Sequence, residues 1–149
     1  MPTFRTASEE ETIALGERLA NGLPPRAVVL LIGNLGAGKT TLAKGIVKGL
    51  GAAEPDEVAS PTFTLIHEYP LADLKAAGRQ KVYHIDLYRL DKPDEAARLG
   101  LDELFEKDAV VLIEWAEKFP ELMPAERIEI RVAAGAGDQR EITVTPITT

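Results

Sequence analysis

Residues 33–40, with the sequence GNLGAGKT, combine residue types and spacing that suit the binding of a nucleotide phosphate. They fit the pattern GxxxxGK(S/T) in full and directly follow the apolar run of residues 28–32. The glycines let backbone N–H groups turn toward phosphate oxygens, Lys39 can reach the β and γ oxygens, and the Thr40 hydroxyl can hold Mg²⁺. The octapeptide therefore predicts a P-loop, and a glycine-rich turn with a surface lysine is the weaker interpretation.

Two carboxylates that end apolar runs are candidates for the acidic group that a P-loop enzyme places beside its Mg²⁺. Asp86 ends residues 81–86, and Glu114 ends the strongly apolar residues 109–114. Open α/β sheets bind ligands at the carboxyl ends of their strands, where a carboxylate can ligate Mg²⁺, hold one of its waters or orient an attacking water. The spacing does not rank these roles, and a structural acid paired with a loop amide or an arginine is the alternative for each.

Ser60, Pro61 and Thr62 form a third candidate element, because the proline pushes Ser60 out of the helical region of backbone space. Their hydroxyls could then face a γ-phosphate and sense the nucleotide state, although a plain start of a strand explains these residues equally well. Trp115 is the only tryptophan and directly follows Glu114, a position where an aromatic residue is more often part of a core or interface.

The two histidines, His67 and His84, lack the spacing of a zinc site. We expect His67 in a strand, and His84 as a packed neighbour of Asp86 rather than a general base. Arg89 could pair with a phosphate or, as arginines more commonly do, with a carboxylate.

Periodicity in the sequence predicts the elements that must position these residues. Strands are expected at residues 4–6, 28–32, 62–69, 81–86, 109–114, 127–133 and 141–147. The last two should form a hairpin through the turn at residues 135–138. Helices are expected from the capping box of Ser8 and Glu11 to about Leu23, from Thr41 onward, and over residues 93–105 as one or two short pieces.

Between these elements, Gly49, Gly51 and Pro55 indicate a loop, and residues 71–80 indicate an exposed excursion with a short helical piece. The order of helices and apolar strands predicts an α/β fold. We expect a P-loop NTPase-like α/β/α sandwich with a mixed, mainly parallel sheet and a C-terminal hairpin.

The chain has 149 residues, a net charge of −7 and no cysteine. This length suits a single domain, residues 1–149, and the lack of cysteine excludes disulfides, thiolate metal sites and a cysteine nucleophile. We expect a soluble, cytoplasmic protein that meets no membrane, because neither a signal peptide nor an apolar span is visible. The negative charge argues against autonomous RNA or DNA binding, and ordinary solubility explains it better than a basic partner.

Four segments in this order and spacing together resemble one family. They are GNLGAGKTT at residues 33–41, SPTFTL at 60–65 followed by Glu68 and Tyr69, HIDLYRL at 84–90, and LIEW at 112–115. The chain resembles the bacterial TsaE (YjeE) family, the ATPases of tRNA threonylcarbamoyladenosine biosynthesis. Many families share the P-loop, but its combination with HxDxYR and IEW is specific.

The resemblance implies a small P-loop fold that binds ATP or ADP with Mg²⁺ and hydrolyses ATP weakly. It implies service to a complex containing TsaD and TsaB, which installs a threonylcarbamoyl group on adenosine 37 of tRNAs that read codons beginning with A. Transfer RNA would then be met only indirectly, through that complex.

The resemblance also implies roles for individual residues. The phosphate cradle comprises Leu35, Gly36, Ala37, Gly38, Lys39 and Thr40, with Thr41 beside them among the nucleotide-binding residues. Thr40 and Glu114 would hold Mg²⁺, Asp86 belongs to the essential acidic site, and residues 60–62, including Thr62, and Glu114 with Trp115 resemble switch regions. Glu9 and Arg140 would lie around the nucleotide base. The chain departs from the family in Asn34, where an acidic residue is usual, and in the length of residues 71–80.

We therefore expect ATP binding and hydrolysis to drive a conformational cycle on a protein complex. A small-molecule kinase is the first rival, but it usually needs an arginine-bearing lid, and residues 71–80 contain only Lys75 and Arg79 as basic residues. A GTPase is the second, weakened because NKxD and DxxG motifs are absent from the sequence. A nucleotide-gated interaction module without useful turnover is the third.

Overall fold

The computed structural model describes residues 2–58, 65–70 and 81–147, and their strands form one sheet of seven, in the order β1-β7-β6-β2-β5-β4-β3. The four central strands, β6, β2, β5 and β4, are parallel, whereas β1, β7 and β3 pair antiparallel with their neighbours. The strands are β1 (Thr3–Thr6), β2 (Ala27–Ile32), β3 (Ile66–Pro70), β4 (Lys81–Asp86), β5 (Ala109–Glu114), β6 (Arg127–Ala134) and β7 (Arg140–Ile147).

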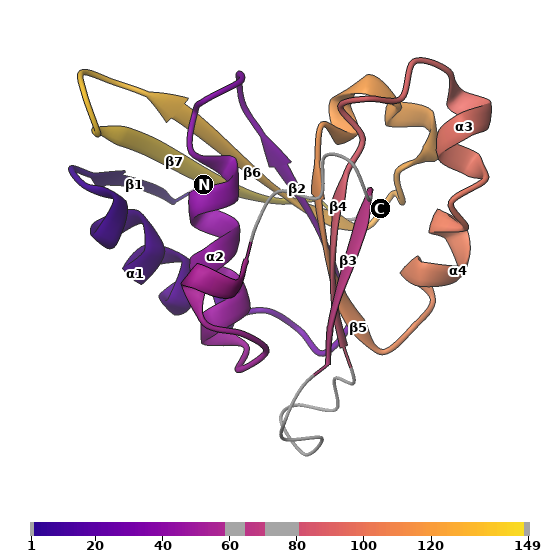
Figure 1. Ribbon diagram of the computed structural model, residues 1–149, viewed down its shortest axis with the longest axis horizontal. Coiled ribbons are helices and arrows are strands. Elements are labelled where there is room, and N and C mark those ends of the chain that lie inside the picture. The colour runs from indigo at the N-terminus through magenta and orange to yellow at the C-terminus, as the bar shows by residue number, and fades with distance from the viewer. Residues whose placement is uncertain (1, 59–64, 71–80, 148–149) are drawn as a thin grey trace.

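Helices cover both faces of this sheet (Figure 1). On one face lie α1 (Glu9–Asn21) and α2 (Lys39–Gly49), and on the other lie α3 (Pro93–Ala97) and α4 (Leu101–Phe105). Short 3₁₀ turns occupy Pro55–Glu57, Ala116–Lys118 and Pro120–Leu122. The expected α/β/α sandwich with a mixed sheet, parallel at its centre, and a closing hairpin is thus confirmed.

Each face of the sheet has its own apolar core, as the alternation of side chains along a strand requires. In β2, Val29 and Leu31 join a core with α1 and α2, whereas Val28 and Leu30 join the core on the opposite face. Because β2 and β5 are covered on both faces, they are continuous apolar runs rather than alternating sequences. These two buried strands carry the P-loop and Glu114 at their carboxyl ends.

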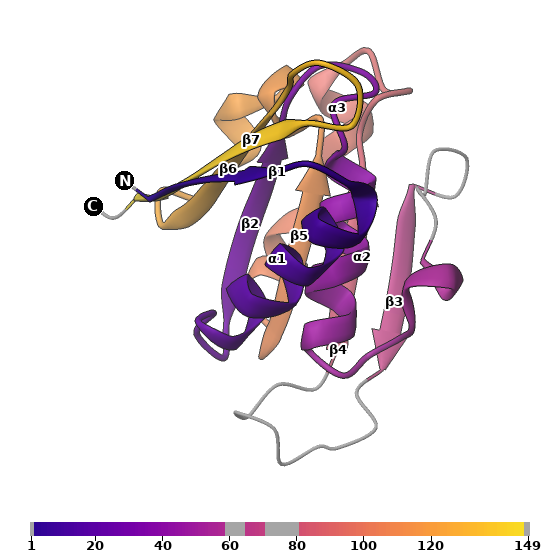
Figure 2. The ribbon, with the colours of Figure 1, turned by 90° about the vertical axis from the view of Figure 1, so that its left-hand side faces the viewer.

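Helices α1 and α2 pack unusually closely, and Figure 2 shows them together against one face of the sheet. A Cβ atom added at Gly45 of α2 would lie 2.1 Å from the backbone oxygen of Ile13 in α1. One added at Gly16 would lie 2.6 Å from the backbone oxygen of Leu42. The backbones can approach this closely only because both positions lack a side chain, and this contact fixes α1 relative to the P-loop helix.

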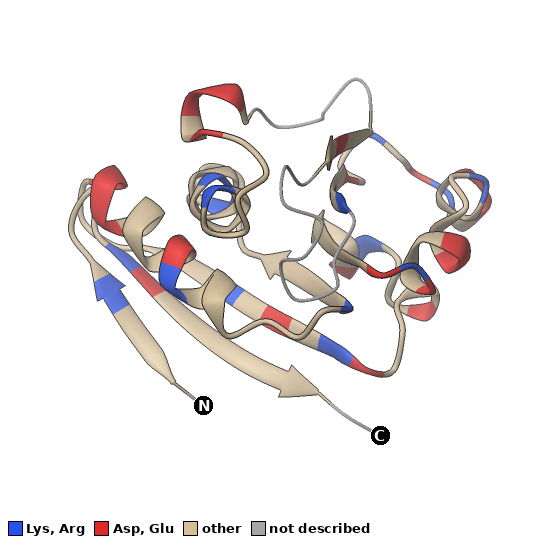
Figure 3. Ribbon diagram, turned by 90° about the horizontal axis from the view of Figure 1, so that it is seen from below, with Lys and Arg blue, Asp and Glu red and all other residues tan. Residues whose placement is uncertain are grey.

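Several helices begin with acidic residues, which Figure 3 marks in red along the ribbon. The first turns of α1, α3 and α4 contain acidic residues, among them Glu9, Asp94 and Asp102, whereas the first turn of α2 contains none. Carboxylates in a first turn are stabilised by the positive end of the helix dipole. Part of the net negative charge therefore has a structural role, and α2 is the described α-helix that leaves its positive end uncompensated.

The main differences from the sequence predictions lie at element boundaries. The P-loop helix begins at Lys39 rather than Thr41, and Gly49 lies in its last turn rather than in a loop. Strand β3 begins at Ile66, because Leu65 has a left-handed backbone (φ 68°) that breaks the extended run predicted from residue 62. Residues 62–64 and the excursion at 71–80 lie outside the described residues.

Candidate functional site

The loop between β2 and α2 has the backbone conformation that the glycine pattern predicts. Gly38, the residue before α2, has φ 105°, and Gly36 has φ 79°. Residues that carry a side chain rarely adopt these φ angles, so glycine at both positions lets the loop turn tightly into the helix. A Cβ atom at Gly33 would lie 2.4 Å from the backbone oxygen of Val132 in β6, which ties the start of the loop closely to the sheet.

The amino end of α2 has free capacity for an anion. The start of α1 is capped by Ser8, whose side chain accepts a hydrogen bond from the backbone N–H of Glu11 at 3.1 Å. Gly38 caps α2 without any side-chain hydrogen bond, and no acidic residue lies in the first turn. Backbone donors and the positive end of the helix dipole are therefore left to a ligand, the arrangement that binds phosphate in P-loops.

Lys39 lies inside this site rather than on the surface, with 4% of its area exposed. Its Nζ donates a hydrogen bond to the backbone oxygen of Gly33 at 2.8 Å and lies 3.5 Å from the centre of the Trp115 ring. Burial lowers the pKa of Lys39 from its usual value, and the nearby carboxylates of Glu117, Glu114 and Asp86 oppose that shift. A buried ammonium group has lost its contact with water, and an anionic ligand beside it would compensate for that loss.

Trp115 forms an aromatic cover over Lys39. The Tyr88 ring stacks on the indole at a centroid distance of 5.0 Å and an interplanar angle of 28°. Trp115 itself has a left-handed backbone (φ 64°), a strained conformation for a bulky residue that costs about 1–3 kcal/mol. Strained residues often mark binding and switch segments. The contact of Trp115 with Lys39 gives such a segment a direct connection to the phosphate site.

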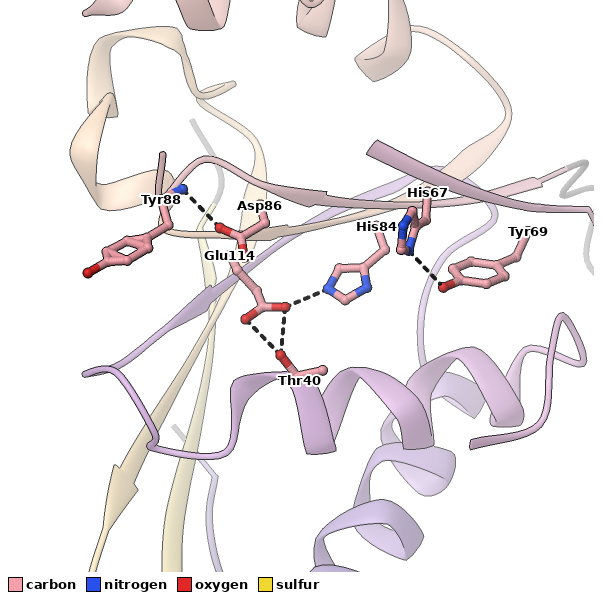
Figure 4. Close-up of polar contacts among 7 residues, drawn as sticks. All are labelled: Thr40, His67, Tyr69, His84, Asp86, Tyr88 and Glu114. Carbon is pink, nitrogen blue, oxygen red and sulfur yellow. Dashed lines mark hydrogen bonds and ion pairs between the residues drawn. The ribbon is translucent and has the colours of Figure 1, made fainter. Parts of the chain in front are cut away.

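Glu114 and Thr40 meet where β5 ends and α2 begins (Figure 4). The Thr40 hydroxyl lies 3.1 Å from both carboxylate oxygens of Glu114, and Nε2 of His84 lies 2.6 Å from its Oε2. Glu114 is 3% exposed, so its charge is supported by these donors rather than by water. His84 was expected beside Asp86, with which it shares a face of β4, but the sequence did not indicate its contact with Glu114.

Asp86 lies next to Glu114 in the parallel register of β4 and β5. Its Oδ1 accepts a hydrogen bond from the backbone N–H of Tyr88 at 2.9 Å, which holds the turn after β4. Asp86 also lines the cavity of the site. Asp86 therefore both shapes the turn that carries Tyr88 and presents an acidic group to a bound ligand.

These groups surround a cavity of about 390 Å³. Glu9 reaches it from the start of α1 and Arg140 from the start of β7, although they are 131 positions apart in the sequence (140 − 9). The Arg140 guanidinium donates to the backbone oxygens of Gly137 and Gln139 at 2.8 and 2.7 Å. The full lining is Glu9, Leu35, Gly36, Gly38, Lys39, Thr40, Thr41, Asp86, Tyr88, Glu114, Trp115 and Arg140.

Nearly all the site residues proposed from the sequence border this one cavity. Ala37 is instead buried in the apolar core that contains α1 and α2, and Thr62, with the rest of residues 59–64, lies outside the described residues. Tyr88 is a lining residue that the sequence analysis did not single out. The HIDLYRL segment contained the only signal for it, and nothing in that segment indicated stacking on Trp115.

The oxygen donors in the cavity fit Mg²⁺. Mg²⁺ is usually bound by one or two protein oxygens together with phosphate oxygens and waters. Thr40 supplies a hydroxyl and Glu114 a carboxylate, and the two groups are in direct contact beside the phosphate loop. The pair lies at the junction of phosphate loop and strand end where P-loop proteins hold the metal.

Within the parts of the chain that the structure describes, none of the helices has the length and apolar character needed to cross a bilayer.

Comparison with known proteins identifies relatives over almost the whole chain. The family model for "Threonylcarbamoyl adenosine biosynthesis protein TsaE" matches residues 6–142. A tRNA threonylcarbamoyladenosine biosynthesis protein TsaE from Bacillus subtilis (strain 168) is 43% identical over 144 residues, which cover 97% of this chain and 85% of the relative. The corresponding protein of Nostoc sp. is 42% identical, with 94% and 83% covered. The crystal structure of Bacillus subtilis YdiB is also similar, with a TM-score of 0.76, 37% identity, and 99% and 86% coverage.

Proposed function

The chain belongs to the TsaE family of tRNA threonylcarbamoyladenosine biosynthesis, and on that premise we propose that it is the Mg²⁺-dependent ATPase of that pathway. In this proposal it binds ATP with Mg²⁺, hydrolyses it slowly when alone, and acts on a cytoplasmic complex of TsaD and TsaB. That complex modifies adenosine 37 of tRNA, and the chain meets tRNA only through it.

The observation that carries the proposal is the convergence of three groups on one cavity. The uncapped amino end of α2 supplies backbone donors, Lys39 supplies a buried cation, and the pair of Thr40 and Glu114 supplies oxygen ligands. Each suits a different part of a triphosphate with its metal ion. Their meeting in one place supports nucleotide binding more strongly than any one of them does.

The residues of the cavity divide the proposed work as follows. The loop from Leu35 to Thr40 and the Lys39 ammonium bind the phosphates, and Thr40 with Glu114 holds the metal ion. The chemistry that Mg²⁺ supplies when bound is neutralisation of charge on the β and γ phosphate oxygens. Asp86 orients the attacking water or a water on the metal ion. Glu9 and Arg140, which line the same cavity, bind around the base.

Trp115 and Thr62 are the proposed switch residues, and the resemblance to the family supplies the role of Thr62. In the structure, Trp115 lies against the Lys39 ammonium, which this proposal assigns to the phosphates. ATP must share or displace that contact, so nucleotide binding should move the turn after β5. If this turn lies differently in the ATP and ADP forms, TsaD and TsaB can bind the two forms with different affinities. Such a difference in affinity is what couples the nucleotide to a partner.

The decisive experiment measures ATP hydrolysis by the pure protein, alone and with TsaD and TsaB, together with the affinity of the apo, ADP and ATP forms for these partners. We expect slow turnover alone, a changed rate in the complex, and different affinities for the three forms. Equal affinities would contradict the nucleotide-gated mechanism, because coupling between binding sites is reciprocal.

Two controls separate the proposal from its rivals. A screen of small-molecule phosphoryl acceptors should yield no acceptor-dependent product, and a product would identify a kinase instead. Lys39→Met should lose activity, because it removes the proposed phosphate contact. Lys44→Met is its matched control, because Lys44 lies on the same helix but does not line the cavity. Loss of activity in both variants would indicate a general effect on α2 rather than loss of the phosphate contact.

A further inference from the structure

His84 is a polar side chain in a position that otherwise calls for an apolar one. It lies within β4, is fully buried (0% exposed), and pairs in register with Leu112 of β5 and His67 of β3. Neighbouring positions of β4, Val82 and Ile85, are fully buried apolar residues. Packing alone therefore does not explain a histidine here, since an aliphatic residue would fill the site without burying ring nitrogens.

The hydrogen bonds of His84 are one-sided. Nε2 lies 2.6 Å from Oε2 of Glu114, whereas Nδ1 is buried and has no hydrogen-bond partner in the described part of the chain. An ionised carboxylate only accepts hydrogen bonds, so when Glu114 is ionised Nε2 is the donor of this contact. Among the described residues, the hydrogen bonding of His84 is therefore directed to Glu114 alone.

The contact with His84 gives the Glu114 carboxylate a second hydrogen-bonding partner, on a different element from the first. Thr40 reaches both oxygens from the start of α2, whereas His84 reaches Oε2 from β4, and Figure 4 shows the carboxylate between them. A glutamate side chain has several rotatable bonds, and one partner alone leaves the carboxylate free to turn about that contact. Donors on two different elements fix it.

We propose that His84 is the positioning residue for Glu114, holding its carboxylate in the orientation in which it joins Thr40 at the metal ion. This inference rests on the proposed function, because it concerns how the protein binds Mg²⁺ with its nucleotide. Metal-binding side chains generally depend on such hydrogen-bonding partners, and loss of one lowers metal affinity by roughly 10- to 100-fold. His84 itself does not line the cavity, so we expect it to act there only through Glu114.

The test measures the affinity of a fluorescent ADP analogue with Mg²⁺ and with EDTA, and takes the ratio of the two as the metal coupling. His84→Leu should lower that ratio by roughly 10- to 100-fold while the affinity in EDTA stays within about threefold. His84→Gln should restore most of the coupling, because its side-chain amide can place a donor close to the position of Nε2. The matched control is His67→Leu on β3, since His67 contacts Tyr69 rather than Glu114.

Coupling in His84→Leu equal to that of the unmodified protein would overturn the inference, as would an equal loss in His67→Leu. If His84→Leu does not fold, His84→Gln is compared with His84→Asn, whose shorter side chain does not place a donor there, and equal coupling in these two variants overturns the inference. Failure of the proposed function looks different. In that case the unmodified protein itself would show no Mg²⁺-dependent nucleotide binding.

Discussion

Replacing Lys39 with methionine tests the phosphate site with little disturbance to the fold. The lysine side chain is 4% exposed, so methionine fills the space of its aliphatic stem and removes only the charged end. Alanine would in addition leave a cavity beside Trp115. We expect Lys39→Met to fold normally and to bind Mg²⁺-ATP much more weakly.

The size of the loss follows from the contacts that Lys39 makes and should gain. Charged hydrogen bonds from Nζ to β and γ phosphate oxygens contribute about 1.5–3 kcal/mol each. Binding disturbs the existing contact with Trp115, which is a cation–π interaction of roughly 0.5–2 kcal/mol. The net loss should therefore be about 1–5 kcal/mol, which corresponds to a roughly 5- to 5,000-fold increase in Kd.

Isothermal titration of Mg²⁺-ATP into the unmodified protein, Lys39→Met and Lys44→Met measures this difference directly. Thermal unfolding of the ligand-free proteins checks that each variant is folded. A Kd for Lys39→Met within threefold of that of the unmodified protein would refute the assignment of this cavity as the phosphate site. A similar loss in Lys44→Met would refute the assignment of the effect to Lys39.

Three further predictions concern the metal ion, the switch and the packing of α1. Glu114→Gln should raise the Mg²⁺ concentration needed for half-maximal hydrolysis while sparing nucleotide affinity in EDTA, and an unchanged Mg²⁺ titration would favour another metal ligand. Trp115 fluorescence should change when ATP binds, because the ammonium of Lys39 lies against its ring; a constant signal would contradict movement of this turn. Gly45→Ala should lower the free energy of unfolding by about 1–3 kcal/mol, because the alanine Cβ would lie 2.1 Å from the backbone of α1. This loss is expected even though alanine is the better helix former. Denaturant unfolding measures this loss, and Gly22→Ala, where the nearest atom is 3.7 Å away, should be nearly neutral.

The sequence by itself determined the local elements and the chemistry of the loop. Ser8 caps α1 as predicted, accepting a hydrogen bond from the backbone N–H of Glu11, but the Glu11 carboxylate accepts from the backbone N–H of Ala7 rather than of Ser8, so only half of the predicted capping box forms. Residues 93–105 form two short helices separated by a left-handed Gly100. Strands β4 and β5 occupy the predicted residues 81–86 and 109–114. These features could be predicted because capping, glycine conformation and side-chain periodicity act between residues a few positions apart. Boundaries were less accurate at α2 and β3, where a glycine cap and a left-handed Leu65 set the ends.

Only the tertiary structure decided which of the candidate residues act together. Glu114 meets Thr40, 74 positions away in the sequence, because β5 lies beside β2 in the sheet. The parallel register of β4 and β5 brings His84 near Glu114, and the turns after these strands stack Tyr88 on Trp115. Strand order and register are set by how the apolar faces of distant segments pack together. The spacing of residues along the chain does not indicate the strand order. The candidate residues could therefore be identified from the sequence, whereas their assembly into one site required the fold.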